Sequence, residues 1–302
     1  MRDFDVIVAG AGPAGLSAAE ILGRCRRRVL VCDTGRPRNA ASHALHGYLT
    51  RDGIAPAEFL RIACEELRRY DTVELRAIEV TAARRESGGF TVDLADGSVL
   101  GCRKLLIATG VTDELPELEG LAALYGRSVF HCPYCDGWEV RDQPLAVYGS
   151  GRTGAGLALE LTAWSRDLVL CTDGDALEPE HRDTLARLGV AVREEPIARL
   201  EGRDGILERI VFTGGATLAR RALFFCTGQH QSSSLAADLG CVFNEKGTVH
   251  TGDYEITNVP GLFVAGDASR MAQMVVVAAA EGAQAALAMN RAMTEEDLAR
   301  LS

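Results

Sequence analysis

Basic residues are scarce in this sequence relative to acidic ones. There are 32 lysines and arginines against 42 aspartates and glutamates, which gives a net charge of −10 at pH 7. Binding to nucleic acid phosphates or to anionic lipid needs a basic surface, and this balance does not provide one. The one basic cluster, formed by Arg24, Arg26, Arg27 and Arg28, ends the first predicted helix, where cations complement the helix dipole. We therefore expect no nucleic acid partner.

Long hydrophobic runs are also missing. No apolar run approaches the roughly 18 residues that suggest a membrane-spanning helix. Residues 1–5 carry alternating charges and lead directly into a short apolar strand, a pattern unlike that of a secretion signal. We expect a cytoplasmic protein that is not associated with a membrane.

Cysteines do not form a disulfide framework. The nine cysteines are an odd number and are scattered over the chain, so most of them are expected to be reduced. Hydrophobic residues make up 47% of the chain and glycines number 32, which is typical of a globular protein with ligand loops. A length of 302 residues predicts two domains of roughly 100 to 200 residues each.

The first 33 residues have the pattern of half a doubly wound α/β domain. A strand over 5–9, a helix over 14–23 and a strand over 28–33 surround a Gly-rich turn. In that turn the backbone amides and the helix dipole can hold a pyrophosphate. The predicted phosphate-binding residues are Gly10, Gly12, Pro13, Ala14 and Gly15.

Asp33 ends the second strand, about 20 residues beyond the turn. A carboxylate there accepts hydrogen bonds from ribose hydroxyls and repels a 2′-phosphate, which favours FAD or NAD over NADP. Near the other end of the chain, Asp267 follows Gly266 at the end of a strand. It is well placed to bind a ribityl chain, which favours FAD, although the same spacing also suits a helix cap.

The remaining segments alternate between strands and helices. An irregular stretch over 40–53 precedes an amphipathic helix over 56–70. Strands over 73–77, 80–84, 90–94 and 99–102 predict an antiparallel meander, followed by a buried strand over 104–108 that ends in Thr109 and Gly110.

A second dinucleotide-type unit begins at residue 145. A strand over 145–148, a turn over 149–154, a helix to about residue 165 and a strand over 168–171 repeat the opening pattern. A meander over 206–220 and a strand over 223–226 follow, and the last third has a strand over 260–267 and an apolar helix through residue 288. We predict an α/β protein with two Rossmann-like, three-layer, doubly wound domains. The second domain, 114–229, is inserted in a discontinuous FAD-binding domain formed by 1–113 and 230–302.

Cys132 and Cys135 are the one close pair of cysteines. Two intervening residues suit a small reversible disulfide, and a helix start would lower a thiol pKa. Asp136 could exchange protons with the dithiol. The alternative is a zinc site that includes His131, but it offers only three ligands and no second cluster completes it, so no metal site is predicted.

The second Gly-rich turn lacks an arginine cluster that could pair with a 2′-phosphate. NADPH is therefore not expected there. Binding of NADH through Asp173 and an empty, vestigial fold both stay open.

Taken together, these residues resemble the low-molecular-weight thioredoxin reductase family over essentially the whole chain. The shared features are the FAD fingerprint, the Cys132-Pro-Tyr-Cys135-Asp-Gly motif and the closing Gly-Asp. The resemblance implies that Cys135 faces the flavin, that Cys132 exchanges with the substrate and that Asp136 is the acid/base. It also implies a homodimer and places further FAD contacts at Arg38, Asn39, His46, Val80, Thr109, Gly110, Gln273, Met274 and Val275.

Two departures refine this resemblance. The His-Arg-Arg type motif for NADPH is missing, and Ala272 stands where reductases carry an arginine before the glutamine. With the stretch from Arg38-Asn39 to His46-Gly47, the chain looks more like the branch that contains the gliotoxin and holomycin dithiol oxidases. That branch implies oxidation of a small-molecule dithiol through FAD, with O2 as acceptor and H2O2 as product. The alternatives are a reductase of a thioredoxin-like protein that uses NAD(P)H or ferredoxin, and a non-catalytic flavin/dithiol redox sensor.

Overall fold

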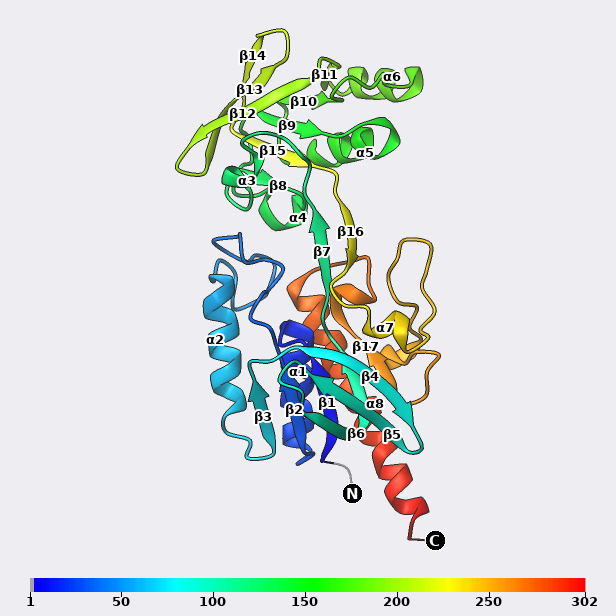
Figure 1. The fold of residues 1–302 in the computed structure, drawn as a ribbon. Helices are drawn as coiled ribbons and strands as arrows, with labels where there is room; N and C mark the ends of the chain where they lie inside the picture. Colours follow the sequence, from blue (N-terminus) through cyan, green and yellow to red (C-terminus); the bar gives the residue numbers. More distant parts are fainter. Residues whose placement is uncertain (1–2, 302) are drawn as a thin grey trace. The chain divides into compact units, whose positions relative to one another are not determined.

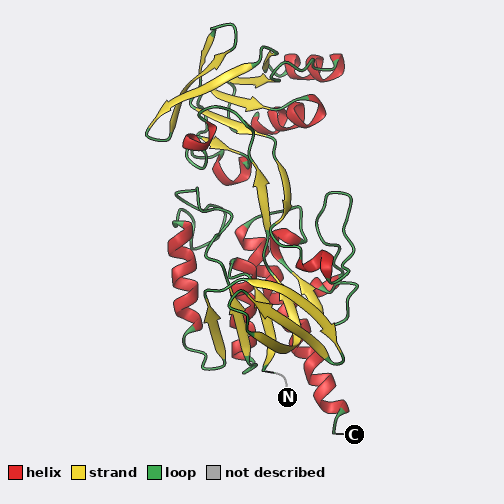
Figure 2. Cartoon of the chain, viewed as in Figure 1, coloured by secondary structure: helices red, strands yellow, loops and turns green. Residues whose placement is uncertain are grey.

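The computed structural model describes residues 3–301, which form two compact units (Figures 1 and 2). Unit 1 contains the chain up to Ala40, Gly47–Thr112 and the chain from Gln229 onward. Unit 2 contains Ala41–His46 and Asp113–Gly228. The strands β7 (Val111–Glu114) and β16 (Gly228–Gln231) lie where the chain passes between units and pair as a two-stranded sheet.

Unit 1 is built on a seven-stranded sheet with the order β3-β2-β1-β6-β5-β4, in which β17 also pairs with β6. Its strands are β1 (Phe4–Ala9), β2 (Val29–Cys32), β3 (Val73–Arg76), β4 (Val80–Glu86), β5 (Gly89–Leu94), β6 (Val99–Ile107) and β17 (Leu262–Val264). Strands β1, β2, β3, β6 and β17 are parallel to their neighbours in that half of the sheet, whereas β4, β5 and the start of β6 form antiparallel pairs.

Apolar cores cover both faces of this sheet. Along β1, Val6 and Val8 belong to one core, and Ile7 and Ala9 belong to the other. Such strands are continuous apolar runs because both faces of a parallel sheet are covered. The helices of unit 1 are α1 (Pro13–Arg24), α2 (Pro56–Leu67), α7 (Leu235–Asp238) and α8 (Val275–Ala299), with short 3-10 turns η1 (Asp253–Glu255) and η2 (Gly266–Ala268).

Helices α1 and α8 pack in direct backbone contact. A side chain at Gly282 would overlap the carbonyl oxygen of Ala14, so the glycine lets the two helices approach each other. The C-terminal segment therefore completes the layer that α1 begins.

Unit 2 has a five-stranded parallel sheet with the order β11-β10-β9-β15-β8. Its strands are β8 (Val129–Phe130), β9 (Leu145–Tyr148), β10 (Leu168–Cys171), β11 (Ala191–Arg193) and β15 (Ala222–Phe225). An antiparallel sheet of β12 (Ile197–Arg203), β13 (Ile206–Phe212) and β14 (Thr217–Ala219) packs with it through a shared core. The helices are α3 (Leu121–Leu124), α4 (Pro133–Asp136), α5 (Gly151–Leu161) and α6 (Pro179–Arg187).

The predicted fold class is confirmed, since both units combine helices with parallel sheets. Several element predictions were wrong in detail. Strand β3 does not belong to the antiparallel meander, because the chain returns through α2 and pairs β3 in parallel with β2. The predicted strands over 99–102 and 104–108 are a single strand, β6. The charged residues that interrupt its apolar pattern, Arg103 and Lys104, pair with Glu296 of α8.

Three further differences concern strand β12, the end of α8 and the segment Ala41–His46. Strand β12 was missed because charged residues interrupt its apolar pattern, and α8 continues past residue 288 to Ala299 with Met289 and Met293 buried. The structure groups Ala41–His46 with unit 2, whereas the predicted division left this segment in the first domain. Among residues 3–301, none of the helices combines the length and hydropathy of a membrane-spanning segment.

Candidate flavin and dithiol sites

The Gly-rich turn after β1 is closely packed on one side and open on the other. Gly10 has a φ of +105°, and a side chain there would overlap the carbonyl oxygen of Ala108. A side chain at Gly15 would overlap the carbonyl oxygen of Gly10. A Cβ at Gly12 would meet no atom within 4 Å, so open space lies at the N-terminus of α1. A pyrophosphate fits such a place, since the helix dipole and free amides favour an anion.

Asp33 is held at the end of β2 by two backbone amides. Its Oδ1 accepts a hydrogen bond from Ala11 N at 2.8 Å, and its Oδ2 accepts one from Gly35 N at 2.8 Å. Each carboxylate oxygen keeps a further lone pair. The carboxylate is thus fixed beside the turn with acceptor capacity left for ribose hydroxyls.

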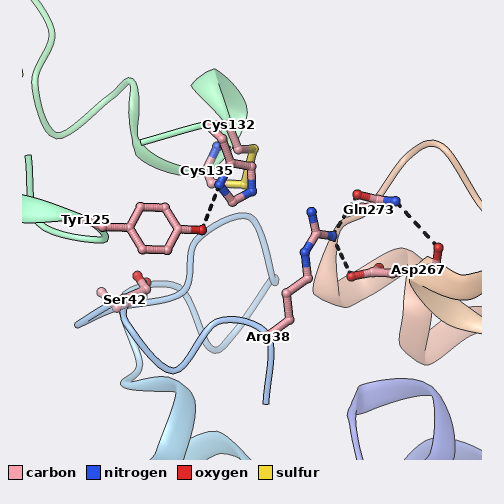
Figure 3. The surroundings of a disulfide bond; sticks show 9 residues. Arg38, Ser42, Tyr125, Cys132, Cys135, Asp267 and Gln273 are labelled. Atoms are coloured by element: carbon pink, nitrogen blue, oxygen red, sulfur yellow. Dashed lines mark hydrogen bonds and ion pairs between the residues drawn. A yellow bond between two sulfur atoms is a disulfide. The ribbon is translucent and has the colours of Figure 1, made fainter. Parts of the chain in front are cut away.

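A polar cluster in unit 1 joins residues that are more than 200 positions apart in the sequence (Figure 3). Arg38 Nη1 donates to Asp267 Oδ2 at 2.8 Å and to Gln273 Oε1 at 2.7 Å. The Asp267 side chain also lies against Gly110, whose φ is +67°. The structure therefore brings together Arg38, Gly110, Asp267 and Gln273, as expected of one ligand site.

Thr109 gives an independent indication of a ligand in unit 1. Its Oγ1 is buried and has no hydrogen-bond partner within residues 3–301. Buried polar groups nearly always form a hydrogen bond, so this hydroxyl is available to bond a ligand. With the open space at Gly12 and the fixed carboxylate of Asp33, it fits a dinucleotide cofactor of the FAD type.

A buried ionic network supports the loop that carries Asp267. Gly266 N donates to Glu281 Oε2 at 2.7 Å, and Arg270 Nε donates to Glu281 Oε1 at 2.6 Å. Arg270 Nη2 reaches both oxygens of Glu255, at 2.8 and 2.9 Å. Burial raises the pKa of Glu281 to about 7. Sequence reasoning missed this network, because an isolated glutamate inside an apolar helix gives no sign of its partner.

The remaining predicted cofactor contacts occupy separate places. Met274 packs near Gly47, whereas Val80 is buried in the core at the start of β4. Asn39 follows Arg38 on the same loop, and Val275 begins α8. His46 belongs to unit 2, where its partner is Glu139. Contact of these residues with FAD stays a prediction.

The two cysteines of the predicted redox pair form a disulfide in unit 2 (Figure 3). Their Cα atoms are 5.3 Å apart. Cys132 is the N-cap of α4 and its Sγ accepts a hydrogen bond from Cys135 N at 3.2 Å. Pro133 stands at the first helical position, where its fixed φ favours the helix start. The motif thus forms the short helical turn that the spacing predicts.

Asp136 follows the disulfide directly and is partly buried. The pKa of its carboxyl is raised to about 7, chiefly by burial; the charge of Glu139 acts in the same direction and His46 acts in the opposite one. A group that titrates near neutrality is suited to take up and return a proton. His131, the third ligand of the alternative zinc site, has its Nδ1 3.1 Å from the hydroxyl of Tyr125. Within residues 3–301, no three His, Cys, Asp or Glu residues are gathered as a metal site would require.

The second Gly-rich turn lies in unit 2 between β9 and α5. Asp173 accepts hydrogen bonds from the Tyr148 hydroxyl at 2.8 Å and from Ile197 N at 2.7 Å, and so ties β12 to β9. Arg193 and Arg199 pair with Glu195 and Glu201. A nucleotide phosphate would have to compete with these carboxylates for either guanidinium.

Comparison with known proteins agrees with this geometry. The family model described as pyridine nucleotide-disulphide oxidoreductase matches residues 4–282. The chain is 32% identical to the thioredoxin reductase tcpT of Claviceps purpurea, over 90% of this chain and 88% of the relative. It is 30% identical to the thioredoxin reductase sirT of Leptosphaeria maculans, over 99% of this chain and 97% of the relative.

Solved structures of similar proteins match nearly the whole chain. The crystal structure of HlmI matches with a TM-score of 0.94 and 37% identity, covering 99% of this chain and 95% of that one. A putative thioredoxin reductase, TrxB, from Bacillus anthracis matches with a TM-score of 0.92 and 33% identity, covering 97% and 99%.

Proposed function

The chain belongs to the pyridine nucleotide-disulphide oxidoreductase family, and from this premise we propose that it is an FAD-dependent oxidase of a small-molecule dithiol. The family and the enzyme class predicted from the sequence are confirmed, since the relatives are thioredoxin reductase-like flavin disulfide oxidoreductases. The observation that carries the proposal is the Cys132–Cys135 disulfide with the Asp136 carboxyl beside it.

The proposed reaction begins at the disulfide. Asp136 takes the proton of a substrate thiol, and the resulting thiolate attacks Cys132 Sγ and displaces Cys135. The second substrate thiol resolves the mixed disulfide, which leaves the substrate oxidised and both cysteines reduced. FAD bound in unit 1 would supply the two-electron acceptor for this pair, with O2 as the final acceptor and H2O2 as the product.

We assign FAD to unit 1. The turn from Gly10 to Gly15 and Asp33 would hold its pyrophosphate and adenosine ribose, and Asp267 would bind the ribityl chain. Thr109 offers a buried hydroxyl without a protein partner, and Gln273 would lie along the isoalloxazine. A homodimer, expected from the family, belongs to the same proposal.

The choice of oxidase over reductase rests on unit 2. Asp173, Arg193 and Arg199 are engaged with protein groups, so a nicotinamide nucleotide would have to compete with these contacts for them. The alternative is a thioredoxin-disulfide reductase fed by NAD(P)H or ferredoxin, which the names of the relatives favour. Ferredoxins are acidic, and a chain with a net charge of −10 would repel them.

Anaerobic stopped-flow absorbance decides between these functions. The holoprotein is mixed in turn with dithiothreitol, NADH and NADPH, and bleaching of the flavin is followed. The oxidase predicts bleaching by the dithiol alone, with recovery and peroxide release on admission of air. Rapid bleaching by NADH or NADPH would make the protein a reductase.

Two serine variants complete this experiment. Cys135→Ser is expected to lose turnover while it keeps bound FAD, and Cys226→Ser, which changes a free cysteine, is expected to behave as wild type. A Cys135→Ser protein with most of its activity would contradict the assignment of the dithiol.

A further inference from the structure

A short segment of the N-terminal region packs with unit 2 and brings a histidine to the dithiol helix. Ala41–His46 is grouped with unit 2, and His43 Nδ1 lies 3.5 Å from the carbonyl oxygen of Gly126. A side chain at Gly126, whose φ is +76°, would overlap the carbonyl of Ala41. The close approach at Gly126 fixes the segment, so the position of His46 at its end is determined by packing.

His46 lies beside Glu139, three residues beyond Asp136 in the chain. Its Nε2 lies 3.6 Å from Glu139 Oε1, and the two side chains are 18% and 32% exposed. The partial burial of both groups limits screening of their charges by water. Asp136, Glu139 and His46 therefore form a cluster of three titratable groups next to the disulfide. His131 precedes Cys132 in the chain, and its ring is engaged with Tyr125.

We propose that His46 is a positioning residue of the dithiol reaction, which through its pairing with Glu139 determines the charge around Asp136 and hence the pH range in which Asp136 exchanges protons. This inference rests on the dithiol chemistry of the proposed function. It does not depend on which compound finally accepts the electrons. A segment distant in sequence thus places an imidazole beside Glu139, the carboxylate three residues beyond Asp136.

The proton path of the exchange is balanced without any further reactant. The first substrate thiol gives its proton to the Asp136 carboxylate, and its sulfur bonds to Cys132 while the Cys132–Cys135 bond breaks. Asp136 returns the proton to the Cys135 thiolate. The second thiol repeats the transfer through Asp136 to Cys132, so that one dithiol and one disulfide become one disulfide and one dithiol.

The two partners of the pair act on Asp136 in opposite directions, and this defines the test. His46 lowers the pKa of Asp136 and Glu139 raises it. His46→Gln is therefore expected to move the titration of Asp136 to higher pH, and Glu139→Gln is expected to move it to lower pH, each by about one pH unit or less. His46→Lys places a permanent positive charge beside Glu139 and should hold the titration of Asp136 at or below the wild-type position.

Two readouts separate this role from a structural one. The first is the pH dependence of anaerobic flavin bleaching by dithiothreitol in the holoprotein, and the second is direct titration of the Asp136 carboxyl by NMR of 13C-labelled aspartate. The second readout needs no turnover, so it stands even if the proposed oxidase activity fails. FAD content and far-UV circular dichroism verify that each variant is folded.

His250→Gln and Glu245→Gln change exposed residues of unit 1 and serve as matched controls, with profiles expected to equal the wild type. Shifts of opposite sign for His46→Gln and Glu139→Gln support the proposal. Unchanged titrations, or shifts of the same sign, overturn it. If His46→Gln does not fold, the direction of the shift in Glu139→Gln and the position of the profile in His46→Lys decide in the same way.

Discussion

Removal of the Arg270 side chain tests whether the buried network beside the loop that carries Asp267 stabilises unit 1. In Arg270→Ala, two carboxylates that are nearly inaccessible to water lose the cation between them. The side chains of Glu255 and Glu281 are 1% and 5% exposed, whereas that of Arg270 is 38% exposed. Glu281 also accepts the hydrogen bond from Gly266 N, so a change in its position affects the loop directly.

The expected loss of stability follows from this burial. Breaking a fully buried ion pair from one side costs about 3 to 5 kcal/mol, because a charge remains buried without compensation. Since more than a third of the Arg270 side chain reaches water, we expect about 2 to 4 kcal/mol in the free energy of unfolding of unit 1. For a unit of this size the loss corresponds to a fall of roughly 5 to 15 °C in Tm.

Two measurements test this prediction. Thermal melting is followed by circular dichroism and by the rise in flavin fluorescence on release, and the Kd for FAD is measured on protein stripped of cofactor. Arg291→Ala, which removes an arginine with an 83% exposed side chain on the same helix as Glu281, is the control and should melt as wild type. A Tm for Arg270→Ala within about 2 °C of wild type would refute the reasoning, because it would mean that the two carboxylates do not need their cation.

Three further predictions concern single positions. Gly12→Ala should fold with an unchanged Tm, because its Cβ meets no protein atom, but it should bind FAD more weakly in a fluorescence titration. Gly15→Ala should fail to fold, because its side chain would overlap the backbone. An FAD affinity of Gly12→Ala equal to that of the wild type would contradict the pyrophosphate site. The pKa of Glu281 is raised by burial from 4.5 to about 7, so this group stabilises the folded state below pH 4.5 and the stabilisation is lost as pH rises to about 7. Glu281→Gln should remove this loss, which amounts to about 3 kcal/mol of unfolding free energy between pH 4.5 and about pH 7. If the unfolding free energy of the variant depends on pH as in the wild type, the prediction is wrong. Asp136→Asn should slow dithiol exchange by about 100-fold at pH 7.5. It should also abolish the inflection near pH 7 in the rate profile, which the raised pKa of Asp136 predicts. Stopped-flow rates measured between pH 5.5 and 9 test both effects.

The sequence predicted the elements that repeat a local pattern. The turn at Gly10 and the Cys132–Cys135 pair were found because glycine spacing and cysteine spacing are local signals. Strand β12 was not found, because charged residues interrupt its apolar pattern and its pairing with β13 is visible only in three dimensions. The join of 99–102 with 104–108 was missed for a related reason, since Lys104 is neutralised by a residue about 190 positions away.

Some site residues were likewise predictable from local sequence patterns, and others became apparent only in the three-dimensional structure. Asp33 and Asp267 were identified from their places at strand ends, where ligand-binding residues of α/β sheets gather. Arg38 was named only from the family resemblance, and its pairing with Asp267 and Gln273 could not be read from spacing. The link between His46 and Glu139 depends on how the segment Ala41–His46 packs, which no periodicity in the sequence reports.

The close packing of α1 against α8 has a consequence for synthesis of the protein. Strands β1 and β2 are made before unit 2, yet the contact of Gly282 with Ala14, the pairing of Arg38 with Asp267 and the strand β17 all need residues that are made after it. Unit 2, apart from its six-residue N-terminal segment, is continuous and complete at Gly228, so it can fold while the remaining chain is still being translated. Unit 1 must instead keep its first apolar strands without their later partners through that interval, and the polar cluster of Arg38, Asp267 and Gln273 forms only after residues beyond Gly228 have been made.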